Sequence, residues 1–146
     1  MVKIEESILI DRPVEEVWKF KTDPSNGPKY NPDIVEVRQV SSGPFGVGTT
    51  FRMIRAKTPK VLDLRVIKHQ LNSEFTAEVI SGPIKGSTLG SSFGTVEGKT
   101  RLTETYDFKF SGLYKLGVLF VGGTAKREVA TLLGNIKLML ESKAKS

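Results

Sequence analysis

The sequence predicts an α+β domain in which a curved antiparallel sheet of about seven strands holds one long C-terminal helix across its concave face. Short runs of alternating apolar and polar residues, separated by turn residues, extend from residue 34 to residue 110. A helical apolar pattern replaces this alternation after Gly112. The 146 residues are the usual size of one domain, and they contain no internal repeat or linker.

The N-terminal segment predicts one strand followed by a short helix. Residues 2–10 alternate between apolar and polar side chains, as a half-buried strand does. Pro13 then opens a helix, because proline is tolerated in a first helical turn. Val14, Val17 and Trp18 follow at the spacing of one helical face, so this helix has an apolar stripe.

A second short helix is expected directly after the first. Asp23 can cap it, and Pro24 suits its first position. Gly27, Pro28 and Pro32 prevent it from becoming long.

Six further strands are predicted as an antiparallel meander. Tight turns such as Leu71–Ser73 and Glu97–Lys99 join consecutive strands, which favours antiparallel neighbours. The expected strands are 34–40, 49–56, 61–69, 75–80, 87–96 and 100–110. The glycine-rich segment 43–48 is no phosphate-binding loop, because it lacks Gly-Lys-Ser/Thr and a following helix.

The C-terminal part predicts a helix from about Gly123 to Glu141, roughly 28 Å long and able to cross the sheet. The apolar segment 113–121 is expected to form a preceding helix or a lid, with Gly122-Gly123 as a break or hinge. The domain is expected to span 1–141, with 142–146 as a frayed tail. Where the helix does not fill the concave face, an apolar cavity remains.

Composition narrows the classes of function. The chain has no cysteine and one histidine, so neither disulfides nor a metal site are expected, and no cofactor is expected. It shows no signal peptide and no membrane span, which favours the cytoplasm. The net charge of +6 is dispersed, without the aromatic platform of a nucleic-acid binder. We expect no nucleic acid, at most weak contact with anionic surfaces, and a monomer or weak dimer.

Several segments together resemble the START-like superfamily, also called SRPBCC or helix-grip proteins. The family includes the birch pollen allergen group, START lipid-transfer domains and polyketide cyclase/dehydrase-like proteins. The resemblance rests on Ile8 to Pro24 with its Pro13 and Trp18, on Tyr30-Asn31-Pro32, on Gly46 to Arg52, on Gly98 to Thr103, on Phe110-Ser111-Gly112, and on Ile136 to Glu141. It implies the helix-grip fold and a pocket for hydrophobic molecules. It carries over no catalytic residue, because the family has no catalytic signature common to its members.

The last strand contains the most informative polar residues. Leu102, Glu104, Tyr106 and Phe108 share one face by strict alternation, which would point a carboxylate and a phenol into the concavity. Glu104 and Tyr106 are weak candidates for catalysis. They are stronger candidates for polar groups that orient a ligand in the pocket. Alternatively, Glu104 pairs with a basic neighbour such as Arg52, lies at the rim, or is turned away by a bulge.

Two other polar or aromatic residues also have alternative interpretations. His69 is expected on the exposed polar face of its strand. Tyr30 either guards the cavity mouth or packs beneath the helices.

Three functions remain open at this point. The leading hypothesis is non-covalent binding of a lipid, isoprenoid or polyketide-like compound, with the protein not an enzyme. The expected ligand-binding residues are Tyr30, Phe51, Leu64, Phe75, Glu104, Tyr106, Phe108 and Phe120. Leu116, Phe120 and Gly122-Gly123 either form a gate over the pocket or pack against the sheet edge. The alternatives are a cyclase/dehydrase-type enzyme using Glu104 and Tyr106, and a protein- or membrane-surface interaction module. Glu104→Gln separates the first two, since only an enzyme would lose turnover while it retains binding.

Overall fold

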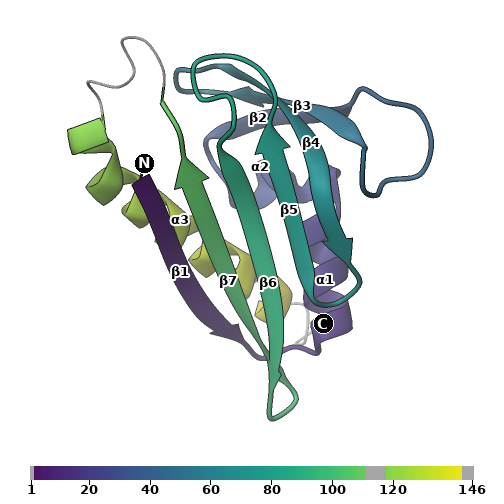
Figure 1. Ribbon diagram of the computed structural model, residues 1–146. Helices are drawn as coiled ribbons and strands as arrows, with labels where there is room; N and C mark the ends of the chain where they lie inside the picture. Colours follow the sequence, from purple (N-terminus) through teal and green to yellow (C-terminus); the bar gives the residue numbers. More distant parts are fainter. Residues whose placement is uncertain (1, 111–117, 143–146) are drawn as a thin grey trace.

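Seven antiparallel strands form one curved sheet in the order β1-β7-β6-β5-β4-β3-β2 (Figure 1). The computed structural model describes residues 2–110 and 118–142. The strands are β1 (Val2–Ile10), β2 (Ile34–Gln39), β3 (Thr50–Arg55), β4 (Val61–Gln70), β5 (Glu74–Val79), β6 (Thr88–Val96) and β7 (Lys99–Phe108). The predicted fold is confirmed, and the structure adds that the first strand pairs with the last.

A tight turn sets the register of β6 and β7. Glu97 and Gly98 join β6 to β7, and both have positive φ, 51° and 81°. Two-residue turns of this kind match the right-handed twist of a hairpin. The turn places Val96 opposite Lys99, and the same register places Ser91 opposite Glu104. A local turn therefore brings together two polar side chains of the site described below.

Short helices connect β1 to β2, which lie at opposite edges of the sheet. They are α1 (Val14–Thr22), the 3₁₀ turn η1 (Pro24–Asn26) and α2 (Gly27–Tyr30). Asp23 caps η1, with its carboxylate accepting a hydrogen bond from the Ser25 N–H at 3.0 Å. The predicted second helix thus begins as a 3₁₀ turn and continues through Gly27 and Pro28 to Tyr30.

The long helix α3 (Val118–Ser142) begins earlier than predicted. The expected break at Gly122-Gly123 is wrong, because both glycines lie inside the helix. A glycine destabilises a helix by about 1 kcal/mol relative to alanine but does not forbid it. No helix among the described residues is long and apolar enough to cross a membrane. Residues 111–117, where part of the predicted lid falls, and 143–146, most of the predicted tail, lie outside the described residues.

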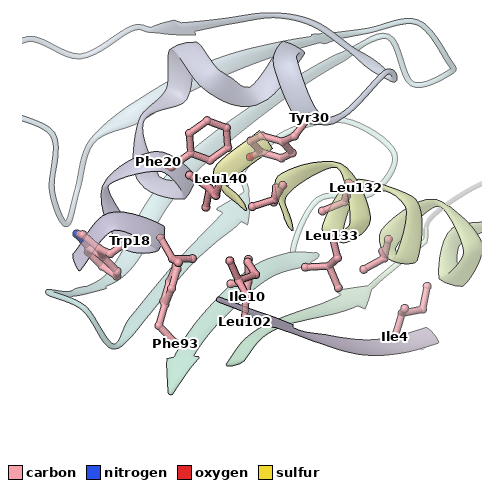
Figure 2. Packing of buried hydrophobic residues seen from close by; sticks show 13 residues of the cluster. Ile4, Ile10, Trp18, Phe20, Tyr30, Phe93, Leu102, Leu132, Leu133 and Leu140 are labelled. Atoms are coloured by element: carbon pink, nitrogen blue, oxygen red, sulfur yellow. The ribbon is translucent and has the colours of Figure 1, made fainter. Parts of the chain in front are cut away.

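The apolar stripe of α3 packs on the β1 side of the sheet. Leu132, Leu133 and Leu140 belong to one buried cluster with residues of β1, β7 and α1, including Ile10 and Leu102 (Figure 2). A second cluster lies on the other half of the sheet. Its members are Phe51, Leu62, Leu64, Val66, Ala77, Val79 and Ile84. The core therefore has two parts. One is packed between α3 and the β1 side of the sheet, and the other is built on β3, β4 and β5.

Polar contacts fasten the end of α3 to the turn after β1. Arg12 donates from Nε to the Leu140 carbonyl at 3.1 Å and from Nη2 to the Glu141 carbonyl at 3.3 Å. The Glu141 carboxylate accepts from the Asp11 N–H at 2.9 Å and from Lys137 Nζ at 2.6 Å. The two Arg12 bonds satisfy carbonyl groups that a helix end otherwise leaves without partners.

The Glu141 contacts predict a pH-dependent contribution to stability. The Asp11 N–H and Lys137 lower the pKa of this carboxyl below its ordinary 4.5. A carboxyl with a lowered pKa stabilises the fold above its ordinary pKa, and this contribution disappears as the pH falls through the folded value. We expect Glu141→Gln to lose no more than about 1 kcal/mol at pH 7, because the pair is partly exposed.

Urea unfolding at several pH values measures this effect. The difference between wild type and Glu141→Gln should shrink as the pH falls well below 4.5. Glu36→Gln, at an exposed position in β2 and away from any helix end, is the control and should show no such trend. A difference that stays constant with pH would show that the contacts at Asp11 do not depend on the charge of Glu141.

Candidate functional site

A cavity of about 180 Å³ lies where the two halves of the core meet. Its apolar walls come from α2, β2 to β7 and α3. They include Tyr30, Ile34, Val37, Phe51, Met53, Leu62, Leu64, Phe75, Ala77, Ile84, Leu89, Tyr106, Phe108, Ala125, Val129 and Leu132. An engineered cavity of about 150 Å³ in another protein stays dry and binds benzene. The space is therefore large enough for a ligand of about one aromatic ring.

The floor of the cavity holds a buried ion pair. Lys21 in the last turn of α1 places Nζ 2.9 Å from Oε1 of Glu104 on β7. The Glu104 side chain is 1 % exposed and the Lys21 side chain 12 %. Oε2 of Glu104 accepts a hydrogen bond from Ser91 Oγ at 2.8 Å, across the β6–β7 pair. Burying one of these charges alone would cost several kcal/mol, so each depends on the other.

Burial and charge act in opposite directions on Lys21. Burial lowers its pKa, but Glu104, with smaller contributions from Tyr30 and Tyr106, outweighs burial and raises the pKa above the ordinary value. Burial, followed by the charge of Glu104, also raises the pKa of the Tyr106 phenol. Near neutral pH the cavity floor therefore presents an ammonium group and a neutral phenol.

The ring of Tyr30 contacts the Lys21 ammonium group. The Lys21 Nζ lies 5.5 Å from the centre of the Tyr30 ring, within the range of a cation–π contact. The backbone of Tyr30 is tied to α3, because Asn135 Nδ2 donates to its carbonyl at 2.9 Å. The ring also packs against Phe20 at 6.0 Å. Tyr30 therefore links α2, α3 and the buried ion pair.

Other ion pairs lie at the border of the cavity. Arg55 Nη2 contacts Asp33 Oδ2 at 2.7 Å, and Lys57 pairs with Glu128. Arg55, Asp33 and Glu128 line the cavity, as does Asp23. Lys21 and Glu104 are the other charged residues of the lining in the described part of the chain. The lining therefore contains two cations and four carboxylates.

Comparison with protein families matches residues 1–141 to polyketide cyclase / dehydrase and lipid transport. The chain belongs to this family. No curated protein matches the sequence. A search of solved structures finds the di-domain ARO/CYC protein BexL of the BE-7585A biosynthetic pathway, at 18 % identity and a TM-score of 0.73. That match covers 97 % of this chain and 47 % of BexL, so this chain spans about half of the di-domain protein.

Two other solved structures match over nearly their whole length. A protein from Thermus thermophilus has 14 % identity and a TM-score of 0.78, with 97 % of this chain and 98 % of that one covered. A START superfamily protein from Mycobacterium smegmatis has 14 % identity and a TM-score of 0.70, with 98 % and 97 % covered. At these identities the likeness shows a shared fold, in agreement with the predicted START-like resemblance.

Most of the ligand-binding residues predicted for this polyketide cyclase/dehydrase family member lie at the cavity. Those that line it are Tyr30, Phe51, Leu64, Phe75, Glu104, Tyr106 and Phe108. Phe120 belongs to α3, but its side chain is outside the described part, and so is Leu116. The suggested pairing of Glu104 with Arg52 is wrong. Arg52 Nε contacts Asp63 Oδ1 at 2.8 Å instead.

The expectation that His69 is exposed is also wrong. A register shift in β4 between Val66 and Lys68 reverses the alternation, so that His69 pairs with Phe75. Its half-buried ring lies 5.3 Å from that of Trp18 and 6.2 Å from that of Phe45. A one-residue bulge moves every later side chain of a strand to the opposite face. His69 therefore packs in an aromatic cluster next to the cavity wall formed by Phe45 and Phe75.

Sequence reasoning missed Lys21 and Ser91. Lys21 continues the stripe of Val14, Val17 and Trp18 at the i+7 position, so helical spacing already placed it on the buried face of α1. A lysine on an apolar stripe opposite an inward carboxylate is a signal for a buried pair. Ser91 could have been found by counting back from the Glu97-Gly98 turn, which places it opposite Glu104.

Proposed function

We propose that this protein, as a single domain over residues 1–141, binds a small hydrophobic molecule non-covalently in the cavity between the sheet and α3. The ligand is a lipid, isoprenoid or polyketide-like compound, and the cavity volume restricts it to small members of about one aromatic ring. The observation that carries the proposal is the cavity of about 180 Å³ with predominantly apolar walls. Removing apolar ligand surface from water would supply most of the affinity, at roughly 25 cal/mol per Å².

Native mass spectrometry of the purified protein tests this proposal. We expect a bound mass that disappears after denaturation and organic extraction, and the extract identifies the compound. A thermal-shift panel of lipids and aromatic compounds covers the case in which the ligand is lost during purification. Absence of both a bound mass and any thermal shift would contradict the proposal and favour the interaction-module alternative.

Ala77→Leu makes the same test specific to the cavity. Ala77 is 2 % exposed and lines the cavity, so a larger side chain occupies space that the ligand would use. We expect affinity for the retained compound to fall about tenfold or more, equivalent to about 1.4 kcal/mol. Val61→Leu on β4, 48 % exposed, is the control and should bind as wild type does. Equal binding by both variants would place the ligand elsewhere.

A second candidate is a cyclase/dehydrase-type enzyme, and the polar cavity floor favours it. Lys21 and Tyr106 present an ammonium and a neutral phenol that could stabilise negative charge on an enolate oxygen. Glu104 is the nearby carboxylate. Turnover that collapses in Glu104→Gln while ligand binding persists would establish this candidate.

A further inference from the structure

The buried ion pair implies a choice among ligands, and this inference rests on the proposed binding function. We propose that the cavity selects uncharged molecules of about one aromatic ring that carry a carbonyl oxygen, and that Lys21 Nζ donates a hydrogen bond to this oxygen. A carboxylate or an ammonium ligand of the same size is excluded.

The first step of the argument is the hydrogen-bonding capacity of the pair. An ammonium group has three N–H donors and no acceptor. Among the described residues, Glu104 is the one carboxylate in contact with Lys21 Nζ, at 2.9 Å. The face of Tyr30 lies 5.5 Å away and accepts no conventional hydrogen bond. Because Lys21 also lines the cavity, donor capacity remains for a ligand oxygen.

The second step is that the Glu104 carboxylate is less accessible to a ligand than the ammonium, although each of its oxygens keeps a second lone pair. Oε1 faces the ammonium, and Oε2 accepts from Ser91 Oγ at 2.8 Å. The carboxylate is 1 % exposed, against 12 % for Lys21, so the lysine is the more accessible partner. A ligand therefore meets a donor at the cavity floor, and the matching ligand group is an acceptor.

The third step concerns the ligand's charge. Lys21 and Glu104 already neutralise each other, so a carboxylate ligand would leave an excess negative charge in an apolar space. The border adds to this penalty through Asp23, the one lining carboxylate without an ion pair among the described residues, since Asp33 pairs with Arg55 and Glu128 with Lys57. A cationic ligand would be attracted at the border. On the floor it would meet the Lys21 ammonium first, because the Glu104 carboxylate is only 1 % exposed.

The experiment compares four ligands of nearly equal shape. Each is a benzene ring with one substituent of three non-hydrogen atoms. They are isopropylbenzene, acetophenone, benzoate and benzamidine in its protonated form. Titration calorimetry at pH 7 measures their binding to wild type and to the double variant Lys21→Met with Glu104→Leu. The ratio of acetophenone to isopropylbenzene affinity should fall about tenfold in the double variant, as expected for losing one hydrogen bond to a charged donor. Intrinsic differences in ligand hydrophobicity cancel in this comparison.

Each outcome has a distinct meaning. An unchanged ratio, or saturable binding of benzoate or benzamidine as tight as that of acetophenone, would overturn the inference. In that case binding of isopropylbenzene would leave the proposed function intact. If none of the four ligands binds wild type, the proposed function fails at the scale of this cavity and the inference fails with it.

A measurement on wild type alone guards against a double variant that does not fold. The carbonyl stretch of bound acetophenone should lie at lower frequency than in an apolar solvent, because donation from an ammonium weakens the C=O bond. A stretch at the apolar-solvent frequency would contradict the proposal. Lys19→Met, at an exposed position on the same helix, should reproduce the wild-type spectrum.

Discussion

Replacing Lys21 with methionine is expected to lower the free energy of unfolding by about 3–5 kcal/mol, because removing one member of a buried ion pair leaves the other charge uncompensated. Glu104 is 1 % exposed and would retain only the Ser91 hydroxyl. The pKa of Lys21 is raised, so the stabilisation from its charge is complete below its ordinary 10.5 and is lost only as the pH rises through the folded value. Urea unfolding at pH 7 therefore measures the full effect.

Adding Glu104→Leu to Lys21→Met should restore most of the lost stability. The double variant has no buried charge, and apolar replacement of a buried pair is often neutral or stabilising. We expect it to lie within about 1 kcal/mol of wild type, the remaining loss coming from the unpaired Ser91 hydroxyl. Lys19→Met should change stability by less than about 0.5 kcal/mol, since Lys19 is exposed. Equal stability of Lys21→Met and Lys19→Met would show that the pair contributes nothing to folding.

Truncating Ile136 to alanine is the second change with a large expected effect. Ile136 is 0 % exposed and lies in the stripe that α3 packs towards β1 and β7. Loss of a buried isoleucine costs about 2–5 kcal/mol, through lost burial and the cavity left behind. The loss should be near the upper end of this range if the packed helix cannot move to fill the space.

Leu138→Ala provides a matched control within the same helix. Leu138 is 68 % exposed, so its truncation should change the unfolding free energy by less than about 0.5 kcal/mol. Both variants are compared by urea unfolding, and similar slopes would indicate that the same surface becomes exposed. Similar losses from both variants would mean that α3 is held by another face than the one in the structure.

Local patterns predicted the strands, because period-two alternation and turn residues are short-range features. The alternation from Leu102 to Phe108 placed Glu104 and Tyr106 on the concave face, and both line the cavity. The Glu97-Gly98 turn required no information beyond its neighbours. The same method failed for His69, because a bulge after Val66 depends on how β4 meets β5 and not on β4 alone.

By itself, therefore, the sequence determined the order of elements, the place of the turn between β6 and β7 and the inward face of the last strand. Only the tertiary structure decided which cation neutralises Glu104, because Lys21 is far from it along the chain and α1 had to be docked against β6 and β7. It also decided where α3 begins and how large the cavity is. Both depend on how a long helix rests on one half of a curved sheet, and a pattern within a segment carries no information about the space between segments.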